Sequence, residues 1–272
     1  MDKNVLAIIL AGGAGERLQP LTQFRAKPSV PFGGKYRIID FTLSNCLHSG
    51  LRRILVLTQY KSHSLHKHLR DGWSVFNPEL QEYVTPVPAQ KINGDNWYQG
   101  TADAIYQNEY LIKRSNAEWT IILSGDHIYR MDYASILKTH QALNADATIA
   151  CMKVPIELAN QFGIVTADAG QKITEFQEKP DITEGCSDDK NFALASMGIY
   201  IFSTKLLIDI LEKDSQDENS SHDFGKDILP SLIDNNKLFA HYFGESEGRV
   251  SPDNYWRDVG TIDSFYQANM DL

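Results

Sequence analysis

Short apolar runs alternate with stretches of helical periodicity between residues 5 and 154 of this chain. The runs typical of buried strands lie at residues 5–11, 53–58, 119–124 and 147–154. The helical patterns lie at residues 40–49, 62–70, 101–114 and 131–143. Strands that alternate with helices in this way form βαβ units, whose strands pair in parallel. The alternation therefore predicts an α/β fold with a mostly parallel sheet flanked by helices.

The second half of the chain is richer in strand patterns, beginning near Val165. We expect strands at residues 172–178, 193–202 and 238–243, and helices at residues 205–213 and 224–235. Two long polar stretches, at residues 78–97 and 181–191, are expected to be loops that cover a substrate.

The charge balance of the chain disfavours two classes of partner. Its 272 residues carry 26 Lys plus Arg against 35 Asp plus Glu, which gives a net charge of −9. Nucleic acid and anionic membranes do not attract a net anion, so we expect neither as the main partner. The apolar run at residues 5–11 is too short to cross a bilayer, and no targeting segment is predicted.

The cysteines argue against a disulfide framework. The chain has three cysteines, Cys46, Cys151 and Cys186, which is an odd number, and they are widely spaced. None of them forms a C-x-x-C pair, so the sequence does not indicate a zinc site. A reducing, cytoplasmic compartment fits this usage.

A glycine loop follows the first apolar run directly. Residues 12–15 read Gly-Gly-Ala-Gly, and Arg17 stands two residues later. Glycines allow backbone N–H groups to approach a phosphate closely. The loop lacks the Gly-Lys-Ser/Thr of a P-loop, and Leu18 stands where a dinucleotide fingerprint has its third glycine. With Lys27 nearby in the sequence, the loop suits a polyphosphate, and a plain tight turn with surface cations is the alternative.

Two carboxylates stand at positions suited to a metal ion. Asp126 directly follows the strand predicted at residues 119–124, and ligands of open α/β sheets bind at the carboxyl ends of strands. Asp258 lies in the aromatic segment 255–261. Two facing carboxylates would hold Mg²⁺ on a phosphate. The alternatives are a turn-capping Asp126 and a packed aromatic corner around Asp258, and His127 is expected to be a hydrogen-bonded neighbour rather than a ligand.

A further cation, Lys179, ends the strand predicted at residues 172–178 and precedes Pro180. A lysine at such a fixed turn could bind a phosphate, and a solvated lysine on an edge strand is the alternative.

A series of segments, in order along the chain, resembles the nucleotide-sugar pyrophosphorylases. The first of them are L-A-G-G-A-G-E-R-L at 10–18, R-A-K-P at 25–28, G-G-K-Y-R-I-I-D-F at 33–41, L-S-N-C at 43–46 and T-Q-Y at 58–60. The later segments resemble, within that superfamily, the bacterial glucose-1-phosphate adenylyltransferases. They are N-W-Y-Q-G-T-A-D-A at 96–104, G-D-H-I-Y at 125–129, E-K-P at 178–180, A-S-M-G-I-Y at 195–200, S-S-H-D-F-G-K-D at 220–227 and Y-W-R-D-V-G-T at 255–261.

This resemblance implies a Rossmann-like nucleotidyltransferase domain with a β-rich sugar-binding half. It implies synthesis of ADP-glucose and pyrophosphate from ATP and glucose 1-phosphate with Mg²⁺, for glycogen biosynthesis. The implied catalytic residues are Arg17, Lys27 and Asp126, with Asp126 and Asp258 on the metal. The implied nucleotide contacts are Gly12, Gly13, Gly15, Gln59, Tyr98, Gly100 and Thr101. The implied glucose 1-phosphate contacts are Glu178, Lys179, Ser196, Tyr200, Asp223 and Trp256, with Lys179 on the phosphate.

The resemblance also sets expectations about domains and partners. The family's β-helix domain would follow residue 272, so we expect residues 1–272 to form one catalytic domain without it. A homo-oligomer and a partner subunit both remain open. Two other functions are alternatives: a sugar nucleotidyltransferase that uses another nucleoside triphosphate, and a catalytically silent regulatory subunit.

Overall fold

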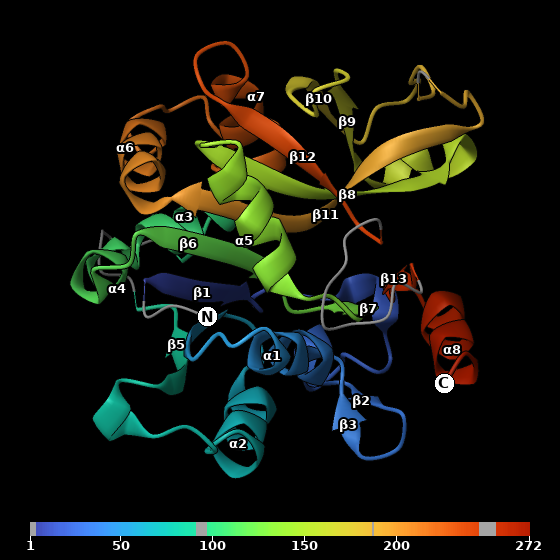
Figure 1. Cartoon of the computed structure of the whole chain (residues 1–272). Helices are drawn as coiled ribbons and strands as arrows, with labels where there is room; N and C mark the ends of the chain where they lie inside the picture. The colour runs from blue at the N-terminus through green and yellow to red at the C-terminus, as the bar shows by residue number, and fades with distance from the viewer. Residues whose placement is uncertain (1–3, 91–96, 187, 245–253) are drawn as a thin grey trace. The chain divides into compact units, whose positions relative to one another are not determined.

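The computed structural model describes residues 4–90, 97–186, 188–244 and 254–272 of the chain. It divides into two compact units (Figure 1). The first unit contains residues 1–97, 122–133 and 248–272, and the second contains residues 98–121 and 134–247. The chain passes between them within β6 (Trp119–Ser124) and at the start of α5 (Tyr133–Ala142).

The first unit is built on a parallel sheet. Its strand order is β6, β1 (Val5–Leu10), β4 (Arg53–Thr58) and β5 (Tyr83–Pro88). β1 pairs with β4 in parallel, and β4 pairs with β5 in parallel. Their apolar side chains are buried, which is typical of a parallel sheet covered by helices. The helices α1 (Ile39–His48) and α2 (His63–Gly72) follow β1 and β4 in the chain, as the alternating pattern predicts.

The strand β5 corrects the prediction of a loop over residues 78–97. A short turn at η3 (Pro78–Leu80) precedes the strand. The backbone N–H groups of Tyr83 and Ala89 donate to carbonyls of Arg52 and Thr58 on the β4 side. Pro86 and Pro88 occupy the alternate positions, where a parallel strand directs its N–H groups away from its neighbour. Prolines therefore cost this edge strand no ladder hydrogen bond, although they make it look like a loop in sequence.

A small antiparallel ladder joins distant parts of the first unit. β7 (His127–Tyr129) pairs with β13 (Trp256–Asp258), and β2 (Pro31–Phe32) pairs with β3 (Tyr36–Arg37). The helix α8 (Ile262–Met270) follows β13. One core cluster contains residues from all these regions, namely Leu18, Val30, Phe32, Ile38, Ile128, Val259 and Ala268. None of these strands, nor α8, was predicted from the sequence pattern.

The second unit is β-rich, as predicted. Its strand order is β10 (Ile173–Glu178), β9 (Gly163–Ala167), β11 (Phe192–Ser203), β8 (Ala147–Pro155) and β12 (Leu238–Tyr242). β11 runs antiparallel to both β8 and β9, whereas β12 runs parallel to β8. Figure 1 shows β8, β11 and β12 with α6 (Thr204–Asp214) and α7 (Leu229–Leu232) in this unit. The short turns η4 (Ile156–Gln161) and η5 (Phe224–Ile228) complete it.

Two predicted helices of this unit differ in the structure. The helix predicted at residues 101–114 is divided into α3 (Thr101–Tyr106) and α4 (Glu109–Ser115). At the break, the Asn108 side chain donates to the carbonyl of Ala104. In a continuous helix that carbonyl would accept the backbone N–H of Asn108 instead. The helix predicted at residues 224–235 begins as the wide turn η5 and continues as the single turn α7.

The fold prediction is confirmed: the chain is mixed α/β, with a mostly parallel sheet flanked by helices and a β-rich half. Within the described residues, no helix is both long and apolar enough to cross a membrane. Cys46 and Cys151 are buried free thiols, and Cys186 is partly exposed and also free.

Candidate active site

The glycine loop follows the carboxyl end of β1. Open α/β sheets bind their ligands at this edge of the sheet. The backbone N–H of Ala11 still donates to Leu57 of β4, and the loop leaves the sheet after that point. A Cβ on Gly12 would lie 3.4 Å from Cβ of Gln59, so the two predicted nucleotide residues are neighbours. Two strand ends therefore deliver Gly12 and Gln59 to one place, as strand ends of a parallel sheet do.

Gly15 holds the loop against the segment that carries Lys27. Its φ of +67° favours glycine, and a Cβ there would lie 3.2 Å from Cβ of Lys27 and 3.1 Å from Thr22. The Thr22 hydroxyl donates to the Gly15 carbonyl at 2.7 Å. A side chain at position 15 would therefore push Lys27 away from the loop.

Lys27 lies between the two predicted metal-binding aspartates. Its ammonium Nζ is 2.9 Å from Asp126 Oδ2 and 2.9 Å from Asp258 Oδ1. The Lys27 side chain is 8% exposed, whereas the two carboxylates are 32% and 28% exposed. The three charges therefore lie close together, with the lysine buried in the protein and the two carboxylates partly exposed to solvent.

The β7–β13 ladder makes this convergence possible. In its register His127 lies opposite Asp258, so Asp126 and Asp258 are brought together from positions far apart in the chain. The Ser124 hydroxyl donates to Asp126 Oδ1 and fixes that carboxylate at the end of β6. A Cβ on Gly260 would lie 3.1 Å from an Arg17 guanidinium nitrogen and 3.0 Å from Asp258 Oδ2, so Arg17 borders the same cluster.

The ionised forms of this cluster are mutually stabilised. Burial alone raises the pKa of Asp126, but the charge of Lys27, with His127 and Ser124, outweighs it and holds that pKa well below its usual range. Burial alone lowers the pKa of Lys27, but Asp126 and Asp258 outweigh it and raise that pKa. The lysine is therefore cationic, and Asp126 anionic, across the physiological pH range.

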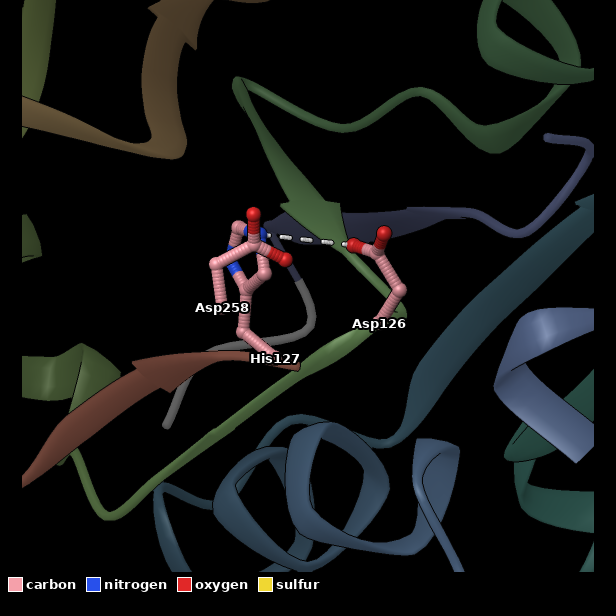
Figure 2. Close-up of side chains that lie close together, drawn as sticks. All are labelled: Asp126, His127 and Asp258. Carbon is pink, nitrogen blue, oxygen red and sulfur yellow. Dashed lines mark ion pairs between the residues drawn. The ribbon is translucent and has the colours of Figure 1, made fainter. Parts of the chain in front are cut away.

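The donor set of this cluster fits a divalent metal ion. Oxygen or nitrogen atoms of Asp126, His127 and Asp258 lie within 4.8 Å of one another, and Figure 2 shows the three side chains directed toward a common region. Carboxylate oxygens are the ligands that Mg²⁺ prefers. A cation already bridges the carboxylates in the form of Lys27, which shows that the geometry suits a positive charge. The residues present therefore fit the metal that the resemblance implies.

His127 is closer to the carboxylates than the sequence suggested. Its Nε2 lies 3.5 Å from Asp126 Oδ1, and its buried Nδ1 has no hydrogen-bond partner among the described residues. Its ring meets the edge of Trp256 with centroids 4.9 Å apart. The sequence predicted a neighbouring role, and no spacing rule could reveal the pairing of His127 with Asp258.

In the second unit, predicted sugar-phosphate residues gather at the end of β10 and at the irregularity of β11 between Ser196 and Tyr200. Tyr200 hydrogen-bonds Ser196 and feels the charges of Glu178 and Asp223, so these four lie close together. The Tyr200 ring stacks on Phe224 with centroids 5.7 Å apart. Burial, and then the two nearby carboxylates, raise the pKa of Tyr200, so its hydroxyl stays protonated and can donate a hydrogen bond.

Lys179 follows β10 in a left-handed backbone conformation, with φ of +49°. Its ammonium lies 2.7 Å from Glu178 Oε1 and is 60% exposed. Glu178 in turn is closely enclosed, because a Cβ on Gly225 would lie 2.5 Å from its Oε2. The pair therefore presents a solvent-facing cation beside a confined carboxylate.

Two of the predicted nucleotide residues, Gly100 and Thr101, lie against the segment that carries Asp223. The Thr101 hydroxyl donates to Asp223 Oδ2 at 2.9 Å, and the Phe224 N–H donates to the same hydroxyl. Asn108 donates to the hydroxyl of Tyr98 at 2.8 Å. The structure therefore assembles Gly12, Gly15, Arg17, Gln59, Lys27, Asp126, Trp256 and Asp258 in the first unit, and Gly100, Thr101, Glu178, Lys179, Ser196, Tyr200 and Asp223 in the second. Gly13 has open space around it, with nothing within 4 Å of an added Cβ.

Comparison with known proteins shows which family the chain resembles. A family model described as nucleotidyl transferase matches residues 6–272. Glucose-1-phosphate adenylyltransferase 2 of Vibrio vulnificus (strain CMCP6) is 62% identical over 270 residues, which cover 99% of this chain and 67% of that protein. Glucose-1-phosphate adenylyltransferases of Paramagnetospirillum magneticum and Nitrosospira multiformis are 50% and 49% identical, with 64% of each relative covered. The chain spans about two thirds of the length of these curated relatives.

Proposed function

This chain belongs to the nucleotidyl transferase family, and within it to the glucose-1-phosphate adenylyltransferases, from which we infer that it makes ADP-glucose and pyrophosphate from ATP and glucose 1-phosphate. The observation that carries the proposal is the convergence of Asp126 and Asp258 on Lys27 beside the glycine loop. The product is the glucosyl donor for glycogen synthesis. We place the enzyme in the cytoplasm, where a reducing environment suits its free thiols.

The reaction needs charge stabilisation more than acid–base chemistry. The phosphate of the sugar is already an oxyanion, so it can attack the α-phosphorus of ATP in line without a general base. Negative charge then grows on the α-phosphoryl group and on the departing pyrophosphate. The enzyme must hold two anions together and spread that charge, which is catalysis by positioning and electrostatics.

The cations of the first unit suit that task. The glycine-loop N–H groups and Arg17 hold the phosphates of ATP, and Lys27 lies beside the departing pyrophosphate. Because Lys27 is largely buried and held by two carboxylates, its ammonium is oriented before the substrate arrives. Gln59 contributes to the nucleotide region next to Gly12.

Nucleotidyl transferases typically use a divalent metal ion, and we propose Mg²⁺ in this enzyme. Asp126 and Asp258 would hold it, with His127 beside them. When bound, it would neutralise phosphate charge and polarise the phosphoryl oxygens. Asp126 can bind a cation because it is ionised. Burial raises its pKa, but Lys27 and the hydrogen bonds of the carboxylate outweigh burial and lower that pKa.

The residues of the second unit suit glucose 1-phosphate. Lys179 offers an exposed cation for the phosphate, and Glu178 and Asp223 offer acceptors for sugar hydroxyls. Ser196 and Tyr200 add hydroxyl donors. Trp256 is proposed to wall the sugar site, and Tyr98, Gly100 and Thr101 to contact the nucleotide. Residues 1–272 are proposed to act as one nucleotidyltransferase domain.

Turnover of the purified chain tests the proposed function. With ATP, glucose 1-phosphate and Mg²⁺, we expect release of pyrophosphate and formation of ADP-glucose, measured with the mass of the protein in solution. Competition among ATP, UTP, dTTP and GTP identifies the nucleotide. Faster turnover with another nucleotide would favour the rival sugar nucleotidyltransferase, and binding of ATP without pyrophosphate release would favour a silent regulatory subunit.

A further inference from the structure

The segment Ser220–Asp223 of the second unit is fixed by hydrogen bonds of Asp214 and His222, two residues that have no role in the proposed reaction. His222 has a left-handed backbone with φ of +55°, a conformation that is uncommon for residues other than glycine. Its imidazole Nδ1 donates to Asp214 Oδ2 at 2.8 Å. Asp214 Oδ1 accepts from the Ser220 hydroxyl at 2.7 Å, and Ser220 Oγ accepts from the backbone N–H of His222 at 2.9 Å. Both oxygens of Asp214, which is the last residue of α6, thus hold this segment.

The same segment caps the start of α3. The carbonyl of His222 accepts the backbone N–H of Ala102 at 2.8 Å and that of Asp103 at 3.3 Å. These two N–H groups lie in the first turn of α3, where a helix supplies no partner of its own. The approach is so close that a Cβ on Gly100 would lie 2.1 Å from the His222 carbonyl oxygen. Glycine at position 100 is therefore what allows the two segments to touch.

The contact continues to the residue proposed for the sugar. Thr101 Oγ1 donates to Asp223 Oδ2, while Asp223 Oδ1 accepts from the N–H groups of Gly225 and Lys226. The orientation of the Asp223 carboxylate thus depends on where Thr101 stands. The position of Thr101 depends in turn on the His222 carbonyl, which accepts N–H groups of the first turn of α3.

We propose that the Asp214–His222 pair is a positioning device, which links Gly100 and Thr101, on the nucleotide side, to Asp223, on the sugar side, so that fixing one group fixes the other. Each substrate then orders residues that bind the other, so ATP and glucose 1-phosphate strengthen each other's binding. Neither Asp214 nor His222 touches substrate in this scheme, and both act through Asp223 and Thr101. The proposal rests on the proposed function, which assigns those two residues to the substrates.

Substitutions at Asp214 test the proposal. Asp214→Ala removes both anchoring oxygens, and Asp214→Asn keeps the shape and one acceptor. Glu212→Gln is the matched control, because Glu212 lies on the same helix and its ion pair, 2.9 Å from Lys113, is exposed. For each variant, KM for glucose 1-phosphate is measured at low and at saturating ATP, together with KM for ATP, kcat and the melting temperature.

We expect Asp214→Ala to raise both KM values about 10-fold, the scale of losing a charged hydrogen bond, with kcat within about 3-fold of wild type. The effect of ATP on KM for glucose 1-phosphate should disappear in this variant, because the segment that links the two groups of residues is no longer held by Asp214. Asp214→Asn should lie between Asp214→Ala and wild type, and Glu212→Gln should match wild type.

A lower melting temperature with both KM values within about 2-fold of wild type would mean a merely structural role and would overturn the proposal. If Asp214→Ala does not fold, Asp214→Asn is judged by the same limit. Absence of turnover in the wild-type chain would instead contradict the proposed function, and normal wild-type turnover with unchanged variants would contradict this inference alone.

Discussion

Lys27 and Asp258 are 231 positions apart in the sequence, and their side chains meet at 2.9 Å. The contact depends on the β7–β13 ladder, whose register places Asp258 opposite His127 and beside Asp126. One buried ammonium thus orders two carboxylates that no local pattern connects.

Replacing Lys27 by methionine should lower the free energy of unfolding by about 1–3 kcal/mol at pH 7, because two carboxylates lose their shared cation. Burial raises the pKa of Asp126, but Lys27 outweighs burial and the pKa is lowered. The stabilisation is therefore fully present above about pH 4, the unfolded pKa, and is lost as pH falls through the folded pKa. Burial lowers the pKa of Lys27, but the two aspartates outweigh burial and raise it. The contribution of Lys27 to stability is therefore lost only as pH rises above about 10.

Denaturant unfolding of wild type and Lys27→Met between about pH 2 and pH 9 measures this difference, because the loss lies below the unfolded pKa of about 4. Lys35→Met, at an exposed lysine of the same unit, is the control. A stability difference that stays constant from pH 7 down to about pH 2 would contradict the ion-pair explanation.

Asp126→Asn should lower kcat at least ~100-fold, which is the scale for losing a preorganised electrostatic group. The substitution keeps the shape of the side chain and removes its charge, so the fold should be retained, with a lower melting temperature because Lys27 loses one of its two partners. Pyrophosphate release measures the effect, with Asp71→Asn as the control because Asp71 is exposed and pairs with Arg70. A variant within ~3-fold of wild type would exclude Asp126 from the metal role.

Lys179→Ala should raise KM for glucose 1-phosphate about 10- to 100-fold and leave kcat nearly unchanged, because the lost charged hydrogen bond holds the substrate in the ground state and the transition state alike. Lys172→Ala is the matched control, since Lys172 is an exposed lysine just before the other end of β10. An unchanged KM for glucose 1-phosphate would refute the assignment of Lys179 to the phosphate.

Gly225→Ala should raise KM for glucose 1-phosphate at least about 10-fold, since misplacing a binding group by about 1 Å is costly. The added Cβ would stand 2.5 Å from Glu178 Oε2 and force that carboxylate to move. Steady-state kinetics measure the change, and Gly72→Ala serves as the control because its Cβ would meet ordinary contacts at 3.8 Å or more. Wild-type kinetics for Gly225→Ala would mean that Glu178 can shift without harm.

Two buried histidines predict acid sensitivity. Burial lowers the pKa of both His140 and His241 to about 4, whereas an unfolded histidine has a pKa of about 6.5. The unfolded chain therefore binds more protons between those values, and the free energy of unfolding should fall by up to about 2.7 kcal/mol for each pH unit lost in that window. Unfolding at pH 7, 6 and 5 measures the slope. His140→Gln should reduce it by about half, and His63→Gln, at an exposed site, should leave it unchanged.

The sequence predicted most of the βαβ alternation, because a buried strand and an amphipathic helix each leave a local pattern. β5 was wrongly expected to be a loop, because its prolines are typical of loops in sequence. They occupy only the positions whose N–H groups would point away from β4, so the strand still pairs. The break at Asn108 was also missed, because it depends on a side chain reaching back to one carbonyl.

The candidate site was predicted through motifs rather than through geometry. Asp126 could be placed from its strand end alone, and the structure brings Asp258 beside it as expected. The ladder register that joins them involves segments too short for any period to be detected. The role of Asp214 could not be predicted either, because it depends on a left-handed histidine and a glycine that meet only after folding.

The prolines of β5 have a consequence beyond that strand. β5 ends the order of the first unit's sheet, so its outer side has no neighbour among the described strands. A strand edge with regular donors invites another extended chain to add to it. Pro86 and Pro88 leave that outer side without an N–H at two successive outward positions, which disfavours the pairing of a further strand there. The chain is thereby protected from edge-to-edge aggregation at the place where its parallel sheet stops.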